Sequence, residues 1–294
     1  MPVSANGRTH LLPAADGWIA VSLARESDIE SIAAWLGVDA DVANTSGLAA
    51  AVHARDTREL VDQGVLLGMP VAALNEASAL PAVLLAMFGQ EDLDQTSQEV
   101  TGAVVLDLSS LWAGPLAAKL LGDRGARVIK AESAQRPDNL RAGRPDLYDE
   151  LNGDKEHVTF DWSDPGELRA LIDKADVVVE SSRPRALAQI GIHPGNILLT
   201  GGGPRVWASI SGYGRSANRV AFGDDAAVAG GLVSYAADGT PRFKGDAIAD
   251  PLTGAATASE IGSVLKRGGR WLLDIAMAGV AAEVAREGRS TPED

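Results

Sequence analysis

The stretch "AVVLDLSSLWAGPLAAKLLGDRGARVIKAES", residues 103–133, determines the predicted fold of this chain. Residues 103–108 read as a buried strand, residues 113–125 as a helix that ends at Gly125, and residues 126–132 as a second strand. The alternation of strand and helix continues over residues 157–162, 163–175, 176–181, 183–191 and 205–212. Strands that alternate with helices of this length predict βαβ crossovers. The predicted fold class is α/β, with a Rossmann-like, doubly wound and mostly parallel sheet.

A smaller α+β domain is predicted before this one. Trp18 to Leu23 form a short apolar run, and an amphipathic helix follows from Asp28 through Trp35. A helix is also expected over residues 55–66, and a short strand at 68–75. Residues 90–102 are polar and without a strong period, which favours a boundary there. The predicted domains are residues 1–98 and residues 99–294.

The composition excludes several classes of function. A net charge of −14 over 294 residues disfavours nucleic acid and anionic membranes as partners, because both are bound by basic patches. There is no cysteine, so disulfides, thiolate nucleophiles and cysteine-ligated metals are excluded. The four histidines are scattered, and no metal site is expected. We find neither a signal peptide nor a membrane-length apolar stretch, and we expect a soluble cytoplasmic protein.

Common cofactor and nucleophile motifs are missing from the sequence. The turn after the first strand of the Rossmann-like domain contains no G-x-G-x-x-G, which disfavours a nicotinamide or flavin cofactor. The chain also lacks G-K-[ST], H-E-x-x-H and the G-x-S-x-G serine elbow. We therefore expect no tightly bound cofactor.

Basic residues gather instead at the predicted carboxyl ends of the strands, where doubly wound sheets bind ligands. They are Lys130, Arg136, Arg141, Arg144 and Arg183. Guanidinium groups suit phosphate because they offer paired donors and stay charged. Alternatively, these are solvated surface charges with local acidic partners, Glu132 and Asp138 among them. The spacing alone leaves both readings open.

These segments, in this order, resemble the family III coenzyme A transferases of the CaiB/BaiF type. This family includes formyl-CoA and carnitine CoA-transferases and α-methylacyl-CoA racemase. The similarity runs from about residue 103 to about residue 280. It implies a Rossmann-like large domain, a smaller second domain and an interlocked homodimer. It also implies transfer of CoA between an acyl-CoA and a small carboxylic acid, with CoA bound as a substrate.

The resemblance assigns CoA-binding residues by matching position. Leu111, Trp112 and Ala113 would lie against the CoA, and the basic strand ends, with Lys130 and Arg141, would hold its nucleotide. Phe160 and the turn Ser181–Ser182–Arg183 would border the adenine and the ribose phosphate. The family usually has Asn-Phe where this chain has Ser181 and Ser182, so we expect an altered adenine pocket.

The segment "GDAIADPLTG", residues 245–254, contains the expected catalytic residue. The resemblance places the aspartate nucleophile of the transferases at Asp250. An ionised carboxylate can open a thioester and carry CoA as an aspartyl thioester. The alternative is purely structural, because Asp250 followed by Pro251 is also a favourable helix start with Asp250 as the N-cap. The two roles are compatible.

Two departures from the family pattern favour other readings. The small-domain segment normally follows the aspartate but precedes it here, and the glycine-rich loop of the formyl-CoA branch is missing. A catalytically degenerate acyl-CoA-binding relative, or a partner subunit, is therefore the second reading. The third is a racemase, which needs a histidine in "RVAFGDDAAV", residues 219–228. No histidine follows His193, so the racemase pair is incomplete.

Overall fold

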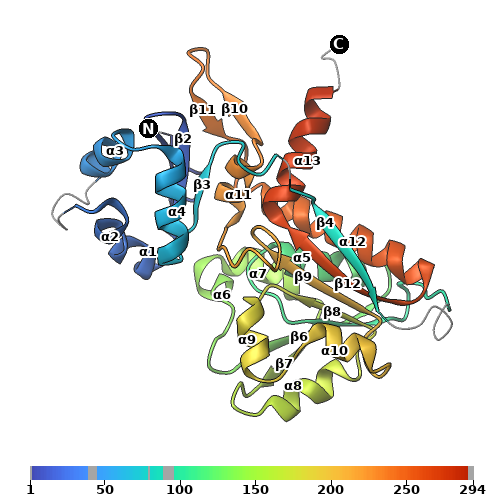
Figure 1. Cartoon of the computed structure of the whole chain (residues 1–294). Coiled ribbons are helices and arrows are strands. Elements are labelled where there is room, and N and C mark those ends of the chain that lie inside the picture. The colour runs from blue at the N-terminus through green and yellow to red at the C-terminus, as the bar shows by residue number, and fades with distance from the viewer. Residues whose placement is uncertain (1, 39–44, 79, 89–95, 291–294) are drawn as a thin grey trace. The chain divides into compact units, whose positions relative to one another are not determined.

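The computed structural model describes residues 2–38, 45–78, 80–88 and 96–290, which form two compact units (Figure 1). The first unit comprises Met1–Ala82, Ser216–Asp250 and Ala276–Asp294. The second comprises Val83–Arg215 and Pro251–Ile275. The chain therefore passes between the units several times. The domain boundary at residue 98 stays a prediction.

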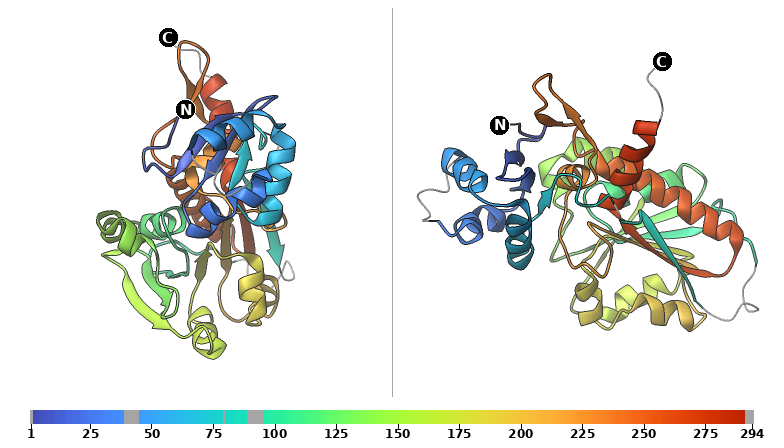
Figure 2. Two further views of the ribbon diagram at one scale, coloured as in Figure 1. Left: turned by 90° about the vertical axis from the view of Figure 1, so that its left-hand side faces the viewer. Right: turned by 45° about the horizontal axis from the view of Figure 1, so that its top comes forward.

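A seven-stranded sheet forms the centre of the second unit, in the order β4-β12-β9-β8-β5-β6-β7. Figure 2 shows the ribbon from two further sides. Its strands are β4 (Val83–Phe88), β5 (Val104–Asp107), β6 (Arg127–Ser133), β7 (Glu156–Phe160), β8 (Val177–Glu180), β9 (Val206–Ser211) and β12 (Arg270–Ala276). β5 pairs in parallel with both β6 and β8, and the outer pairs β6–β7 and β8–β9 are also parallel. At the other edge of this sheet, β4 pairs with β12 in antiparallel orientation. The predicted α/β class and Rossmann-like parallel sheet are confirmed.

Helices cover both faces of this sheet, as the doubly wound architecture requires. The helices that accompany these strands along the chain are α5 (Ala113–Gly122), α6 (Leu140–Gly143), α7 (Pro145–Asn152), α8 (Pro165–Ile172), α9 (Pro184–Gln189), α10 (Pro194–Leu199) and α12 (Ala249–Arg267). Leu106 and Val178 pack in one buried cluster with residues of α8, α9 and α10, such as Leu168. Successive strand residues point to opposite faces, so their neighbours Val105 and Val177 face away from this cluster. α5, which contacts β5, β6 and β8, covers that other face.

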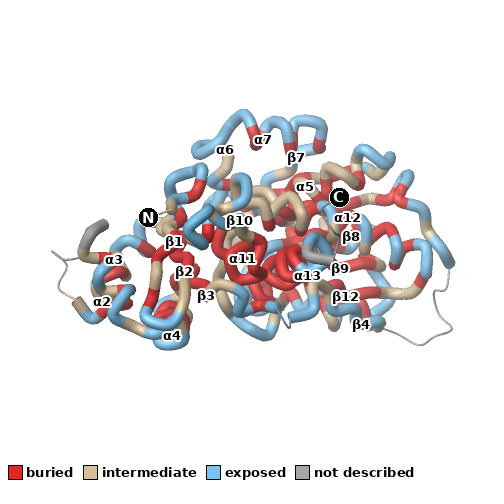
Figure 3. Tube along the Cα trace, turned by 90° about the horizontal axis from the view of Figure 1, so that it is seen from above, coloured by how far each residue is buried: buried red, intermediate tan, exposed pale blue. Residues whose placement is uncertain are grey.

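The first unit is built on an antiparallel sheet in the order β1-β2-β3. Its other elements are a pair of short strands, β10 and β11, and helices α1 to α4, α11 and α13. Their bounds are β1 (Thr9–Pro13), β2 (Trp18–Ser22), β3 (Val71–Ala73), β10 (Val233–Tyr235), β11 (Pro241–Phe243), α1 (Glu26–Glu30), α2 (Ile32–Leu36), α3 (Thr45–His53), α4 (Thr57–Leu67), α11 (Gly223–Ala229) and α13 (Met277–Ser290). Figure 3 shows α11 as a continuous buried segment, and every residue of it is buried. α11 packs on α13 so closely that a Cβ at Gly230 would meet the backbone of Ala282 at 2.5 Å.

Candidate active site

The carboxyl ends of β5 and β8 lie side by side near the centre of the seven-stranded sheet. From β5 the sheet continues through β6 and β7, and from β8 it continues through β9 on the other side. Doubly wound sheets bind ligands at such a reversal of strand order. The backbone N–H of Ser110, after β5, donates to Oγ of Ser181, after β8, at 3.1 Å. Two of the segments predicted to contact CoA are therefore joined directly.

Leu111 adopts an unusual backbone conformation in the loop after β5. Its φ is +69°, which is uncommon for a residue other than glycine. Its N–H donates to both carboxylate oxygens of Asp138, at 3.0 and 3.1 Å. Trp112 follows as the residue before α5, and Ala113 is the first helical residue. Asp138 thus stabilises the conformation of the Leu111–Ala113 turn, which the sequence analysis predicts to contact CoA.

Two lysines and two aspartates are buried next to this turn. Lys130 Nζ donates to the Ser109 carbonyl at 2.5 Å and lies 3.8 Å from Asp107 and 3.6 Å from Asp138. Lys155 Nζ donates to Asp107 at 2.8 Å. Burial alone would raise the pKa of Asp107, but the ammonium groups of Lys130 and Lys155 hold the pKa below its usual range. Lys130 is fully buried and bonded to protein groups; a role of its charge in CoA binding stays a prediction.

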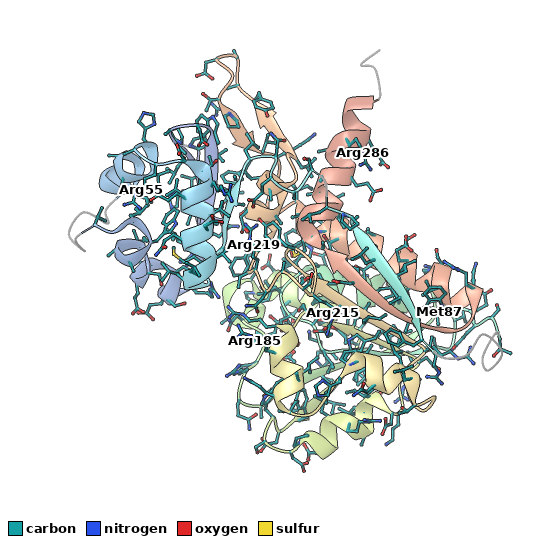
Figure 4. All side chains as sticks on the ribbon, viewed as in Figure 1. Arg55, Met87, Arg185, Arg215, Arg219 and Arg286 are labelled. Carbon is teal, nitrogen blue, oxygen red and sulfur yellow. The ribbon has the colours of Figure 1, made fainter. Side chains whose placement is uncertain are left out.

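Buried Glu180, the last residue of β8, organises the turn that follows. It accepts hydrogen bonds from Ser209 Oγ at 2.5 Å and from the N–H of Ser182 at 2.7 Å. Arg215, labelled in Figure 4, donates to it at 3.1 Å. Burial raises the pKa of Glu180, against the opposing effects of the Ser209 hydrogen bond and the Arg215 charge. Ser182 is thereby fixed, while Ser181 is exposed beside it.

Arg141 has the local acidic partner that the sequence suggested. Its guanidinium donates two hydrogen bonds of 3.1 Å to Glu132 and lies 4.1 Å from the ring centroid of Tyr148. Tyr148 donates to the same carboxylate at 2.6 Å. Burial alone would raise the pKa of Glu132, but the bonds from Arg141 and Tyr148 lower it to about 2. The Arg141 side chain is still 46% exposed, so one face of this pair is open to a ligand.

Phe160 and Arg183 occupy different parts of the sheet edge. Phe160 ends β7 and is buried, with its ring centroid 5.9 Å from that of Trp162. β6 and β5 separate β7 from β8, so Phe160 does not lie next to the turn at Ser181. Arg183 is exposed immediately before α9. Over residues 2–38, 45–78, 80–88 and 96–290, its guanidinium has no carboxylate partner.

Asp250 lies in the first turn of α12, a helix of 19 residues. The predicted N-cap position is wrong, because the helix already begins at Ala249. The reason is a turn that precedes it, in which the Asp250 N–H donates to the carbonyl of Ala247 at 2.8 Å. The N-terminal turn of a helix favours negative charge, since its N–H groups and dipole are positive. This benefit extends over the first turn and therefore includes Asp250.

The carboxylate of Asp250 lies directly against Gly223, the first residue of α11. A Cβ built on Gly223 would fall 2.1 Å from Asp250 Oδ2 and 2.5 Å from the Ala247 carbonyl oxygen. Real Cβ atoms do not approach other atoms so closely, so only glycine fits here. The backbone of α11 thus forms one wall of the position occupied by the Asp250 carboxylate.

Two further acids, Asp224 and Asp225, follow Gly223 and are buried. Four oxygen atoms form a row, from Asp224 Oδ2 through Thr9 Oγ1 and Ser22 Oγ to Asp225 Oδ1, with separations of 3.2, 2.9 and 2.7 Å. Thr9 Oγ1 donates to Asp224, and Ser22 Oγ donates to Asp225, which also accepts the N–H of Phe222. Burial raises the pKa of Asp225 to about 7.

Several of these residues were missed by the sequence analysis. Asp107 and Glu180 had a readable signal, because each ends a run of buried apolar strand residues. Asp224 had no such signal, since two of its partners, Asn6 and Thr9, lie more than 200 positions away.

Neither a metal centre nor a membrane-spanning helix is found in the described part of the chain. Over those residues, no group of three or more histidine, aspartate or glutamate side chains is arranged to hold a metal ion. None of the described helices is long and apolar enough to cross a membrane.

The chain is similar to known proteins in family, sequence and structure. The model of CoA-transferase family III matches residues 100–286. The succinate–glutarate CoA-transferase of Agrobacterium fabrum is 30% identical over 196 residues, which are 59% of this chain and 48% of that protein. The acetyl-CoA:oxalate CoA-transferase of Acetobacter aceti is 30% identical over 125 residues, or 39% of this chain and 32% of that protein. A CaiB/BaiF family structure from Brucella suis has a TM-score of 0.58 at 25% identity, covering 66% of this chain and 57% of that one. The chain spans about half the length of the first of these relatives.

Proposed function

The chain belongs to CoA-transferase family III, and from this premise we propose that it transfers CoA from an acyl-CoA to a carboxylic acid through a covalent intermediate on Asp250. The observation that carries this proposal is the contact between the Asp250 carboxylate and the backbone of Gly223 at the start of a long helix. A carboxylate in this setting is held in place and its charge is favoured by the helix N-terminus. Both are properties that a carboxylate nucleophile needs.

The proposed reaction begins with attack of an Asp250 oxygen on the thioester carbonyl. The carbon–sulfur bond breaks, a mixed anhydride forms and CoA leaves as a thiolate. The thiolate then attacks the aspartyl carbonyl, which releases the first acid and leaves CoA on Asp250 as a thioester. The incoming carboxylate repeats the two steps in reverse, so that a new acyl-CoA leaves and Asp250 is restored. No external oxidant, reductant or resident cofactor is required.

The loops at the carboxyl ends of β5, β6 and β8 are the proposed site for the CoA nucleotide. The Leu111–Ala113 turn, Ser181 and Ser182 would contact it, with Phe160 at the outer strand. The exposed guanidinium of Arg183 and the open face of Arg141 would meet its phosphates. Lys130 would act on this site by holding the Ser109 carbonyl.

The names of the relatives suggest which substrates to test first. They specify succinate and glutarate in one protein, and acetyl-CoA and oxalate in another. We propose a small acyl-CoA and a small carboxylic acid as the substrate classes of this chain. A soluble cytoplasmic homodimer is the proposed form of the protein.

Transfer is tested by following CoA between succinyl-CoA or acetyl-CoA and each of glutarate and oxalate. The account predicts transfer by the wild type, loss in Asp250→Asn, and retention in Glu260→Gln, which removes another carboxylate on the same helix. Equal rates in the wild type and Asp250→Asn would refute the nucleophile. Tight CoA binding without transfer for any pair would instead identify a degenerate acyl-CoA-binding relative. Deuterium wash-in at the α-carbon of a 2-methylacyl-CoA would identify a racemase.

A further inference from the structure

The turn that precedes Asp250 is held by a hydrogen bond to a carboxylate of α11. Asp224 Oδ1 accepts a hydrogen bond from the N–H of Ala247 at 2.9 Å. The carbonyl of the same residue accepts the hydrogen bond from the Asp250 N–H at 2.8 Å. Ala247 has a φ of +45°, a left-handed conformation that alanine adopts only when its surroundings hold it there. The bond from Asp224 therefore stabilises the backbone unit to which Asp250 is attached.

Asp224 is itself held by the N-terminal segment. It is 4% exposed, and its Oδ2 accepts hydrogen bonds from Asn6 Nδ2 at 3.0 Å and from Thr9 Oγ1 at 3.2 Å. Both donors come from the first ten residues of the chain. A buried carboxylate with several donors from separate segments has little freedom to move. One side chain thus links the start of the chain to the turn at Ala247.

The neighbouring residues strengthen this link. Thr9 and Ser22 are register partners in the β1–β2 pair, and Ser22 Oγ contacts Asp225 at 2.7 Å. Asp225 in turn accepts the N–H of Phe222 at 3.0 Å, which fixes the start of α11. Hydrogen bonds therefore link the first turn of α11 to β1, to β2 and to the turn before Asp250.

We infer that Asp224 is a positioning residue for Asp250, and that through it residues 6–9 of the N-terminal segment set the geometry of the nucleophile. The inference rests on the proposed function, since it assigns Asp224 a role in acyl transfer to Asp250. Asp224 acts through the Ala247 turn and needs no contact with substrate. A displacement of a reacting group by about 1 Å can lower a rate by about 100-fold.

The first test measures the rate of adduct formation on Asp250 with succinyl-CoA. Asp224→Ala is expected to lower this rate by roughly 10- to 100-fold without changing the dissociation constant for CoA. Asp224→Asn keeps an oxygen that can accept the Ala247 N–H, and should retain more of the rate than Asp224→Ala. Asp176→Asn is the matched control, because Asp176 accepts a backbone N–H from Val104 in the second unit. An Asp224→Ala protein that is folded and forms the adduct at the wild-type rate would overturn the inference.

The second test reads the position of the turn without relying on activity. Amide hydrogen exchange at Ala247 and Asp250 should accelerate in Asp224→Ala and stay slow in the Asp176→Asn control. Unchanged exchange at both amides would overturn the anchoring role. If the wild type forms no adduct, the proposed function fails, while faster exchange in Asp224→Ala would still support the anchor. The two failures are therefore distinguishable.

Discussion

The Cα of Gly223 lies so close to the carboxylate of Asp250 that an added Cβ would fall 2.1 Å from Oδ2. Asp250 comes from α12 and Gly223 from α11, so the position of the carboxylate depends on how these two helix starts meet.

Gly223→Ala should displace the Asp250 carboxylate. The added methyl overlaps Asp250 Oδ2 and the Ala247 carbonyl, so the free energy of unfolding should fall by about 1–3 kcal/mol. Adduct formation at Asp250 should fall by at least about tenfold. Gly288→Ala is the control, because a Cβ there meets nothing within 4 Å. A folded Gly223→Ala protein with wild-type adduct formation would show that the contact has no effect on the nucleophile.

The stability of the protein should depend on the protonation of Asp225. Burial raises the pKa of Asp225 from 3.8 to about 7, so the folded state holds a proton that the unfolded chain releases. The stabilisation of the folded state that comes from this proton on Asp225 is therefore fully present below about pH 4, and it is lost as the pH rises through about 7. The total is on the order of 4 kcal/mol.

Denaturant unfolding between pH 4 and pH 8 measures this contribution. Asp225→Asn imitates the protonated carboxyl, with an amide that can donate to Ser22, and should remove this part of the pH dependence. The difference between the two proteins isolates the contribution of the Asp225 carboxyl to the pH dependence. Identical pH profiles would exclude the proton at this site.

Lys155→Met should destabilise the second unit strongly. The ammonium of Lys155 donates to Asp107, to the Pro115 carbonyl and to Asn152, each at 2.8 Å. Its removal leaves the buried Asp107 carboxylate with the more distant ammonium of Lys130, at 3.8 Å, and the free energy of unfolding should fall by about 3–5 kcal/mol. Lys119→Met removes a more exposed pair with Asp123 and should cost less than about 1 kcal/mol. Equal effects of the two substitutions in chemical denaturation would contradict this role of Lys155.

Arg183→Ala should weaken CoA binding. Arg183 is exposed, and within the described residues no carboxylate pairs with its guanidinium, so it is available to a phosphate. We expect the dissociation constant for CoA, measured by calorimetry, to rise roughly tenfold, or about 1.4 kcal/mol. Arg169→Ala is the matched control, because Arg169 is engaged by Asp173 at 2.8 Å. The same affinity in both variants would place the CoA phosphates elsewhere.

The sequence predicted those features whose parts are close together along the chain. The strands from residue 103 to residue 212 were predicted, because each is a short apolar run bounded by polar turns. Helices α5, α8 and α9 were predicted with them, whereas α6, α7 and α10 were missed. The family was also predicted, and the match over residues 100–286 confirms it. β4 was missed as a member of the large sheet, because its partner β12 begins at Arg270, far along the chain.

The environment of the candidate site was less predictable for the same reason. Asp250 and the basic strand ends are visible as residue types in short motifs. The hydrogen bonds of Asp224 with Asn6 and Thr9 join residues that are 218 and 215 positions apart in the sequence, and no local pattern predicts them. The burial of Lys130 also depends on tertiary packing, and it directs the ammonium group to the Ser109 carbonyl. Residue type identifies candidates, whereas their partners depend on packing.

The central claim is that Asp250 carries CoA, and trapping that intermediate tests it most directly. The protein is incubated with succinyl-CoA or acetyl-CoA, treated with hydroxylamine or borohydride, and digested for mass spectrometry. The account predicts a hydroxamate or an alcohol at Asp250 in the wild type and in Glu260→Gln, and none in Asp250→Asn. An unmodified Asp250 while CoA moves between acids, or modification of another residue, would contradict it.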